Sequence, residues 1–424
     1  MNYQHSVFLD TAKCKGCTHC LRRCPTEAIR IRDGHAIINS LHCIDCGECI
    51  RVCPYKAKRA VYDFLADIPK DKYIIALPAP TLFGQFQNLT DADYLIQGLI
   101  DMGFDDVFEV SKAAEIVTDY TRQYMKQADA VYPLISSACP VVVRLINIRF
   151  PSLKEHVIPV IPPIELAGKM AKERALKNNP GLKPQDIVTV FISPCPAKVS
   201  WIKNKGNREE PAVDYLVSIS EVYFKLLSAM NADKVPDKSC ESGMVGIGWA
   251  SSGGEGSALM NDRYLAADGI ENVIRVLDNI ETGSISDVDF VELNACSGGC
   301  VGGVLTVENP YIARGRLRTL KRYMPVTRNH SSLNSGRPLP DNLKTVKLSQ
   351  FENVSALNLS RSESFRMMAA MQSILAELPA LDCGSCGAPT CRAFAEDVVK
   401  GEADINECIF RMREQLKLMK KKDS

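Results

Sequence analysis

Two periodicities of hydrophobic residues divide the central part of the chain into predicted strands and helices. Short apolar runs at 73–77 and 107–110 predict strands, and apolar residues at helical spacing over 92–102 predict a helix between them. This alternation of strands and helices continues to about residue 300. Strands separated by helices are typical of parallel pairing. We therefore predict an α/β fold with mostly parallel sheets for this region.

Three apolar runs of the central region, at 131–135, 187–192 and 288–291, each lead into a cysteine motif. The cysteines in these motifs are Cys139, Cys195, Cys296 and Cys300. The carboxyl ends of strands are where α/β folds place ligand sites, and four thiols match the ligand count of a cubane iron–sulfur cluster. The alternatives are buried structural cysteines or a zinc site.

The N-terminal region contains the pattern Cys-x2-Cys-x2-Cys-x3-Cys-Pro twice, starting at Cys14 and at Cys43. This is the two-cluster ferredoxin pattern, in which the fourth cysteine of each run binds the other cluster. One 4Fe–4S cluster is thus predicted on Cys14, Cys17, Cys20 and Cys53, and a second on Cys43, Cys46, Cys49 and Cys24. The zinc alternative would need only four thiols per ion in looser spacing. The predicted role of this module is electron transfer.

The C-terminal region combines an apolar helical stretch at 362–378 with a fourth group of cysteines. These are Cys383, Cys386, Cys391 and Cys408. They predict another 4Fe–4S cluster, with structural zinc as the alternative. The segment that carries them resembles the small helical Fe–S domain of corrinoid and electron-transport proteins. The basic amphipathic tail 409–422 is either a solvated helix end or a surface for a partner or a second copy of the chain.

The 424 residues are predicted to form three domains, 1–65, 66–350 and 360–424. The first is a small ferredoxin domain, the second the α/β domain and the third a small helical domain, so the chain is α+β overall. Because there are two separate cluster modules, we expect two routes by which electrons leave the central site. One route passes through the ferredoxin domain and the other through the C-terminal cluster.

Composition and charge restrict the possible partners, the expected location and the role of the cysteines. The net charge of +1 gives no argument for nucleic acid or an anionic membrane as a partner. No apolar run reaches about 18 residues and the N-terminus lacks the apolar core of a secretory signal, so we expect a cytoplasmic chain without a membrane segment. Seventeen cysteines in such a chain indicate metal binding rather than disulfides. The motifs use sixteen of them and leave Cys240 without a role.

A ferredoxin pattern followed by three cysteine motifs in this order resembles the FeFe hydrogenases. Their motifs Thr-Ser-Cys-Cys-Pro and Met-Pro-Cys-x-x-Lys correspond to 136–140 and 193–198. Their motif Glu-x-Met-Ala-Cys-x-x-Gly-Cys-x-x-Gly-Gly corresponds to the segment from Glu292 to Gly303. The loop Pro78-Ala79-Pro80-Thr81 is similar to their Ala-Pro-Ser loop. The resemblance covers about residues 1–310.

The resemblance implies reversible activation of H2, with protons and electrons as products, at an H-cluster. The four central thiols would hold its cubane, and Cys300 would bridge to a diiron unit carrying CO, cyanide and azadithiolate. This makes four 4Fe–4S clusters and one diiron unit in total. The Lys198 ammonium would donate to one cyanide, and the backbone and hydroxyl of Ala79, Pro80 and Thr81 would serve the other.

Several family residues are replaced in this chain. The cysteine that donates protons in the family is Ala138 here, and the packing methionines are Ser193 and Asn294. The two relay glutamates cannot both be placed within 113–122, and the family's serine is absent from 153–163. Candidate substitute carboxylates are Glu115, Asp119 and Glu165, each of which is otherwise an ordinary surface charge on a helix.

Three functions are compatible with these residues. The first is a slow, sensory FeFe hydrogenase that reports to a separate signalling protein, as the departures and the added C-terminal cluster suggest. The second is a bidirectional ferredoxin hydrogenase with another proton path. The third is an iron–sulfur carrier or scaffold protein with cubanes only. Ala138 favours the first over the second, whereas Lys198 and the loop at Ala79 favour the first over the third. A redox partner protein is expected in the first two cases.

Overall fold

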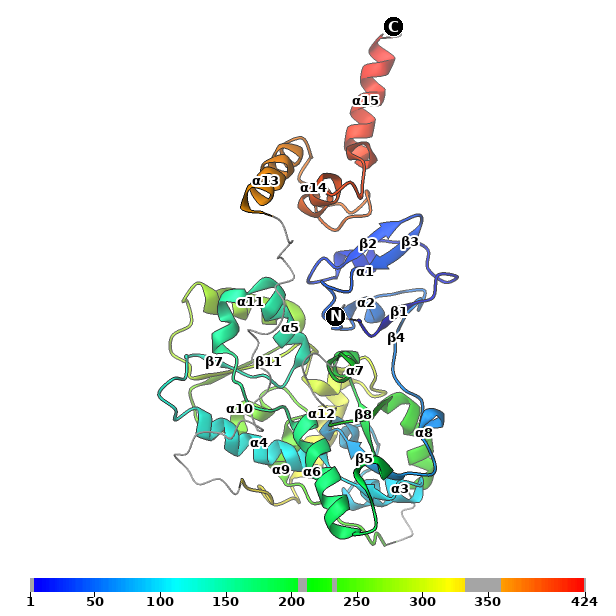
Figure 1. The fold of residues 1–424 in the computed structure, drawn as a ribbon, viewed down its shortest axis with the longest axis vertical. Helices are drawn as coiled ribbons and strands as arrows, with labels where there is room; N and C mark the ends of the chain where they lie inside the picture. The colour runs from blue at the N-terminus through cyan, green and yellow to red at the C-terminus, as the bar shows by residue number, and fades with distance from the viewer. Residues whose placement is uncertain (1–3, 205–211, 231–234, 332–359, 423–424) are drawn as a thin grey trace. The chain divides into compact units, whose positions relative to one another are not determined.

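The computed structural model describes residues 4–204, 212–230, 235–331 and 360–422. The chain forms two compact units (Figure 1). The larger unit comprises Val61–Phe351, and the smaller unit joins Asn2–Ala60 with Glu352–Ser424. The predicted first and third domains thus share one unit. The predicted boundary between residues 350 and 360 lies outside the described residues.

Two parallel sheets form the frame of the larger unit. The first has the order β6-β5-β8-β9, with strands at Asp106–Val107, Tyr73–Pro78, Ile187–Ser193 and Tyr215–Ser218. The second has the order β10-β11-β7, with strands at Tyr264–Asp268, Phe290–Asn294 and Leu134–Ile135. All pairs in both sheets are parallel. The predicted α/β class with parallel sheets is confirmed.

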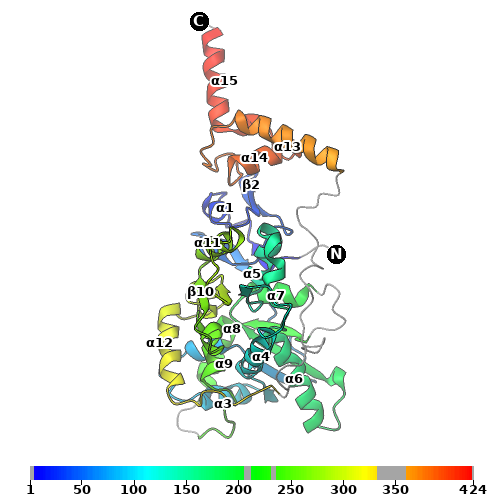
Figure 2. The ribbon, with the colours of Figure 1, turned by 90° about the vertical axis from the view of Figure 1, so that its left-hand side faces the viewer.

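Helices cover both faces of the four-stranded sheet. On one face Ile75 and Leu77 of β5 share a hydrophobic core with α4 (Val110–Tyr124) and α6 (Pro163–Asn178). On the other face Ala76 belongs to a second core with α3 (Asp93–Asp101), α8 (Ile219–Ala229) and α12 (Pro310–Lys321). Successive side chains of a strand point to opposite faces, so a strand covered on both faces is a continuous apolar run. Figure 2 shows α6 and α12 on opposite sides of this unit.

The larger unit contains five further α-helices among its described residues. They are α5 (Pro140–Arg149), α7 (Pro196–Lys203), α9 (Met244–Gly248), α10 (Gly254–Ala258) and α11 (Ile270–Glu281). One predicted strand is shorter than expected, because the apolar run 107–110 contributes only its first residue to β6 and its last residue begins α4. No helix in the described ranges is long and apolar enough to cross a membrane.

The smaller unit contains two short antiparallel strand pairs and five α-helices among its described residues. Strand β1 (Val7–Leu9) pairs with β4 (Lys58–Ala60), and β2 (Ile29–Arg32) pairs with β3 (His35–Ile38). Its helices are α1 (His19–Arg22), α2 (Glu48–Arg51), α13 (Arg361–Ala376), α14 (Cys391–Val399) and α15 (Ile409–Lys422). The predicted helical stretch 362–378 is largely α13.

Candidate metal centre

The strand ends of both sheets in the larger unit enclose one cavity of about 880 Å³, part of it open to solvent. Side chains from all three central cysteine motifs line it, together with the loop after β5. The lining includes Ala79, Pro80, Thr81, Ala138, Cys139, Cys195, Lys198, Glu255, Glu292, Asn294, Cys296 and Cys300. The four thiols predicted to act together therefore meet here, although up to 161 residues separate them in the chain.

Two of these cysteines stand where a strand passes into a helix. Cys139 is the N-cap residue of α5 and Cys195 that of α7, and each is followed by a proline in the first turn. Proline suits this position because its fixed φ matches the helix and its missing N–H would have no partner there. The positive end of the helix dipole also favours a thiolate at this point.

Two glycines bring the third motif into place. Gly299 has a φ of +94°, and a Cβ there would lie 2.4 Å from the backbone nitrogen of Ser252. A Cβ at Gly303 would lie 2.1 Å from the carbonyl oxygen of Pro194. Only glycine fits such contacts. The loop that carries Cys300 therefore packs directly against the loop that carries Cys195.

The clustered thiols of the cavity favour the binding of a positively charged group. The pKa of the Cys195 thiol is raised to about 12, chiefly by burial, with an opposing effect of Lys198 and smaller increases from the Cys139 and Cys300 thiolates. Burial raises the pKa of Cys139 as well. Thiolates gathered in such a space repel one another and need positive charge to remain ionised. Iron ions bound to the sulfurs would supply that charge.

Lys198 projects into this group of thiols from α7. Burial by itself lowers the pKa of Lys198, but the charges of Cys300, Cys195 and Cys139 together raise it above the ordinary value. Its Nζ also lies 5.7 Å from the centre of the Phe191 ring. The side chain is thus a buried ammonium at neutral pH and can donate to an anionic ligand in the cavity.

The loop after β5 offers one hydroxyl donor. Thr81 is 1% exposed, and its Oγ1 has no hydrogen-bond partner among the described residues. The backbone N–H of Ala79 donates to the carbonyl of Ile192 at 3.4 Å, and Pro80 has no N–H. A buried hydroxyl without a partner is costly, so the Thr81 side chain is the group in this loop that fits a ligand acceptor.

Cavities in the smaller unit match two of the other predicted thiol sets. One of about 350 Å³ is lined by Cys24, Cys43, Cys46 and Cys49. Another of about 300 Å³ is lined by Cys383, Cys386, Cys391 and Cys408. For the remaining set, the charges of Cys17, Cys14 and Cys53 all add to the effect of burial in raising the pKa of Cys20. In the described ranges no three or more His, Cys, Asp or Glu side chains form a site for a single metal ion.

A buried lysine lies between the two ferredoxin thiol sets. Lys58 on β4 is 3% exposed, and its Nζ has no hydrogen-bond partner in the part of the chain that the structure describes. Burial raises the pKa of both Cys20 and Cys49, and the Lys58 charge opposes that rise in each case. One ammonium therefore acts on a thiol of each set. The sequence analysis did not find Lys58, because nothing in the local pattern distinguishes it from neighbouring surface lysines.

A family model for the "Iron only hydrogenase large subunit, C-terminal domain" matches residues 72–259 and 250–304, which is more than half of the chain. The chain belongs to the iron-only hydrogenase family. A "4Fe-4S dicluster domain" model matches residues 6–54 of this hydrogenase-family chain, and a "Putative Fe-S cluster" model matches residues 378–410. Iron–sulfur domains therefore stand on both sides of the hydrogenase domain in sequence.

Several known proteins similar to this hydrogenase-family chain carry hydrogenase names. The periplasmic [Fe] hydrogenase large subunit of Nitratidesulfovibrio vulgaris is 26% identical over 367 residues, covering 70% of this chain and 86% of that protein. Iron hydrogenase 1 of Clostridium pasteurianum is 22% identical over 55% of this chain and 50% of its own length. A solved structure of a variant of the [FeFe]-hydrogenase HydA1 from Chlamydomonas reinhardtii has a TM-score of 0.45 at 18% identity, covering 60% of this chain and 85% of that one.

Ala138 lines the cavity beside Cys139. Its methyl group can neither donate nor accept a proton. Its backbone N–H donates to Ser136 Oγ at 3.1 Å, and the Ser136 hydroxyl donates to Glu255 Oε2 at 2.6 Å. A hydroxyl and a carboxyl therefore lie close to Ala138.

Glu255 forms a buried acidic pair with Glu292, and both line the cavity. Burial and the charge of Glu292 raise the pKa of Glu255 to about 8. Glu292 accepts the backbone N–H groups of Gly253 at 3.0 Å and Gly256 at 2.8 Å, and it accepts the Asn294 amide at 2.8 Å. These donors favour its ionised form, so the proton of the pair resides on Glu255. The sequence analysis did not single out Glu255.

The three substitute carboxylates suggested by the sequence lie elsewhere. None of them is among the described residues that line the cavity. Glu115 is buried and accepts backbone N–H groups of Gly243, Arg328 and Asn329 at 2.6–3.0 Å. Asp119 pairs with Arg122 at 2.9 Å, and Glu165 accepts the indole N–H of Trp201 at 2.5 Å. All three stabilise loops or helices by these contacts.

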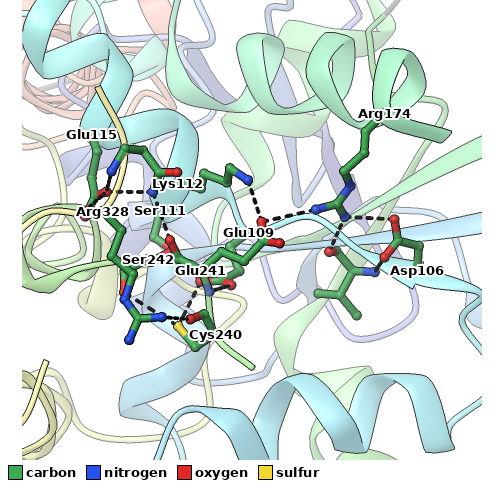
Figure 3. Close-up of polar contacts among 12 residues, drawn as sticks. Asp106, Glu109, Ser111, Lys112, Glu115, Arg174, Cys240, Glu241, Ser242 and Arg328 are labelled. Atoms are coloured by element: carbon green, nitrogen blue, oxygen red, sulfur yellow. Dashed lines mark hydrogen bonds and ion pairs between the residues drawn. The ribbon is translucent and has the colours of Figure 1, made fainter. Parts of the chain in front are cut away.

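Cys240, the cysteine without a motif, has a structural partner (Figure 3). Its thiol donates to the buried carboxylate of Glu109 at 3.0 Å, and the backbone N–H of Glu241 donates to the same side chain at 2.5 Å. The Ser242 hydroxyl donates to Glu109 as well. Burial and the charge of Glu109 raise the pKa of Cys240. The thiol is thus neutral and holds the 240–242 loop to the start of α4.

Proposed function

We propose that this chain activates H2 reversibly at an H-cluster in the central cavity, with slow turnover suited to sensing. The observation that carries the proposal is the cavity itself, where four thiols, a buried ammonium and an unpartnered hydroxyl face one space. Such a donor set fits a cubane joined to a diiron unit with anionic ligands. When bound, that unit supplies the site at which the H–H bond is formed or split.

Each lining residue has a defined part in holding the cofactor. Cys139, Cys195, Cys296 and Cys300 would hold the cubane, and Cys300 would also hold the diiron unit. The Lys198 ammonium would donate a charge-assisted hydrogen bond to one cyanide, and the Thr81 hydroxyl would donate to the other. The three thiol sets of the smaller unit would hold further 4Fe–4S clusters, which would supply electron transfer to a redox partner protein.

Protons are supplied through the acidic pair. Glu255 lines the cavity and holds a proton near neutral pH, and its Oε2 lies 2.6 Å from Ser136 Oγ, so a proton can pass between these two groups. Glu292 is the ionised member of the pair, and its negative charge favours the protonated form of Glu255. This route makes up only in part for the family's thiol, because the residue at the thiol's own position is Ala138 here and carries no acid. A well-placed general acid contributes about 10²–10⁴-fold to a rate, so the substitution slows turnover strongly.

Slow turnover distinguishes this proposal from a bidirectional ferredoxin hydrogenase. A protein that binds H2 and changes redox state without rapid consumption can report the gas to a separate signalling protein. The added C-terminal cluster domain favours this role, because it offers an electron site beyond the ferredoxin pattern. An iron–sulfur carrier with cubanes only would need neither Lys198 nor the Thr81 hydroxyl in the cavity.

Infrared spectroscopy of the matured protein tests the proposal. We expect CO and cyanide bands from the diiron unit that shift when H2 is added and return when it is removed. Protein carrying only its cubanes is the control and should show no such bands. A matured protein without bands would refute the hydrogenase function and leave the carrier function. Bands that do not respond to H2 would refute the sensory function.

A further inference from the structure

Asp397 on α14 forms a buried ionic contact with the ferredoxin part of the smaller unit. It is 2% exposed, and its Oδ2 accepts from Arg30 Nε at 2.7 Å and from Arg32 Nη2 at 2.6 Å. The two arginines lie on strand β2, more than 360 residues away in the chain. A buried carboxylate is costly unless it is paired, so this contact specifies one relative position of the two segments.

Backbone contacts beside Asp397 bring a cysteine loop onto the same strand. The N–H of Ile31 donates to the carbonyl of Gly387 at 2.8 Å, and Arg32 Nη1 donates to the carbonyl of Cys386 at 3.4 Å. Gly387 has a φ of +78°, and a Cβ there would lie 2.1 Å from the carbonyl oxygen of Ile31. Only glycine allows this approach, so the loop after Cys386 is built to lie against β2.

A second contact joins the two cysteine loops themselves. Gly384 stands between Cys383 and Cys386, and a Cβ at Gly384 would lie 3.2 Å from Leu21 Cδ2 and 3.7 Å from Thr18 Cγ2. Thr18 lies between Cys17 and Cys20 in the sequence, and Leu21 follows Cys20. The segment carrying two thiols of the C-terminal set therefore touches the segment carrying two thiols of the first ferredoxin set.

We infer that the C-terminal cluster exchanges electrons directly with the ferredoxin cluster held by Cys14, Cys17, Cys20 and Cys53, and that Asp397 holds the two together. The inference rests on the cluster assignments of the proposed function. Electron tunnelling falls steeply with distance, so two clusters whose ligand loops touch are the natural donor and acceptor. The C-terminal cluster then lies in series with the ferredoxin clusters, in place of the separate second exit expected from the sequence.

The test measures magnetic coupling in the full-length protein with its cubanes reconstituted and no diiron unit. In the reduced wild type, electron paramagnetic resonance should show spin–spin interaction between the C-terminal cluster and a ferredoxin cluster. Replacing Cys383 and Cys386 with alanine removes the C-terminal cluster and should remove that interaction. Asp397→Asn should weaken it at unchanged iron content, and Asp397→Glu should retain most of it. The control Glu402→Gln changes an exposed acid nearby and should have no effect.

The outcomes separate this inference from the proposed function. Loss of coupling in Asp397→Asn at full iron content supports the contact. Full coupling in both Asp397→Asn and the double variant Arg30→Gln/Arg32→Gln would overturn it, as would absence of coupling in a wild type that holds all its cubanes. The double variant keeps every thiol. Its spin coupling therefore tests the contact even if Asp397→Asn lowers the iron content. A wild type that fails to bind the C-terminal cubane would instead contradict the cluster assignments.

Discussion

The central cavity and the smaller unit assemble their thiols in different ways. In the ferredoxin part the ligand sets come from a short repeated pattern, and the repeat is visible in the contacts. Cys24 accepts the N–H of Ala28 at 3.2 Å, and Cys53 accepts that of Ala57 at 3.3 Å. In the cavity the thiols come from three distant motifs that meet because strands of the two parallel sheets end around one cavity. Local spacing defines the first kind of site, and topology defines the second.

The two regions also differ in the functional groups that they contain. The smaller unit has complete thiol sets for electron transfer and adds one beyond the ferredoxin pattern. The cavity contains four thiols and Lys198 but has a methyl group at Ala138, and Glu255 of its acidic pair accepts a hydrogen bond from the Ser136 hydroxyl. Under the proposed function, proton supply rather than electron supply is therefore expected to limit turnover.

The largest effect is expected from removing one thiol of the cavity. Cys195→Ala should abolish the infrared bands of the diiron unit completely, because the cubane that anchors it loses a ligand. The paramagnetic signals of the ferredoxin clusters should remain. Cys240→Ser is the matched control, since a hydroxyl can still donate to Glu109 and the position is outside the cavity. Bands that survive in Cys195→Ala would contradict the assignment of this thiol.

Glu255→Gln should lower turnover by about 10²-fold, because the amide cannot deliver the proton that a general acid supplies. The H2 evolution rate of the wild type should fall as the pH rises through about 8, where Glu255 loses its proton, and the variant should lack this inflection. Glu271→Gln changes an exposed acid on α11 and is the control. An unchanged rate and pH profile in Glu255→Gln would place the proton route elsewhere.

Lys198→Ala should weaken retention of the diiron unit by about 10–100-fold, from the loss of a charge-assisted hydrogen bond of about 1.5–3 kcal/mol. The measurement is the fraction of protein with infrared bands after dialysis, and the remaining cyanide bands should shift. Lys203→Ala on the same helix removes only an ion pair with Asp63 and should leave both unchanged. Full retention with unshifted bands would show that Lys198 does not reach the cofactor.

Lys58→Met should have the smallest effect, a shift of both ferredoxin clusters to more negative reduction potentials. The buried ammonium favours the more negative, reduced form of each cluster, so its loss makes both harder to reduce. Redox titration followed by paramagnetic resonance measures the shift. Arg59→Met removes an exposed cation with a contact to Asp10 at 3.9 Å and is the control. A shift in only one cluster would show that Lys58 does not act on both.

Much of the fold could be predicted, because buried strands and amphipathic helices carry periodic patterns. The thiol sets could be predicted too, since cysteine is rare and its spacing is specific. Glu255, Lys58 and the contact of Asp397 with Arg30 and Arg32 could not, because ordinary charged residues acquire these roles only from burial and distant partners. For the same reason Glu115 was a poor candidate for proton transfer, since its backbone partners are invisible in the sequence.

The most direct test of the central claim is the rate of H2 oxidation and evolution by the matured wild-type protein under saturating electron mediator. The mediator removes any limit from electron transfer, so the rate reports proton supply. We predict a rate at least about 10²-fold below that of family enzymes that retain the cysteine acid, together with infrared bands that respond fully to H2. A rate comparable to those enzymes would contradict the account, because it would show that Ala138 does not limit proton delivery.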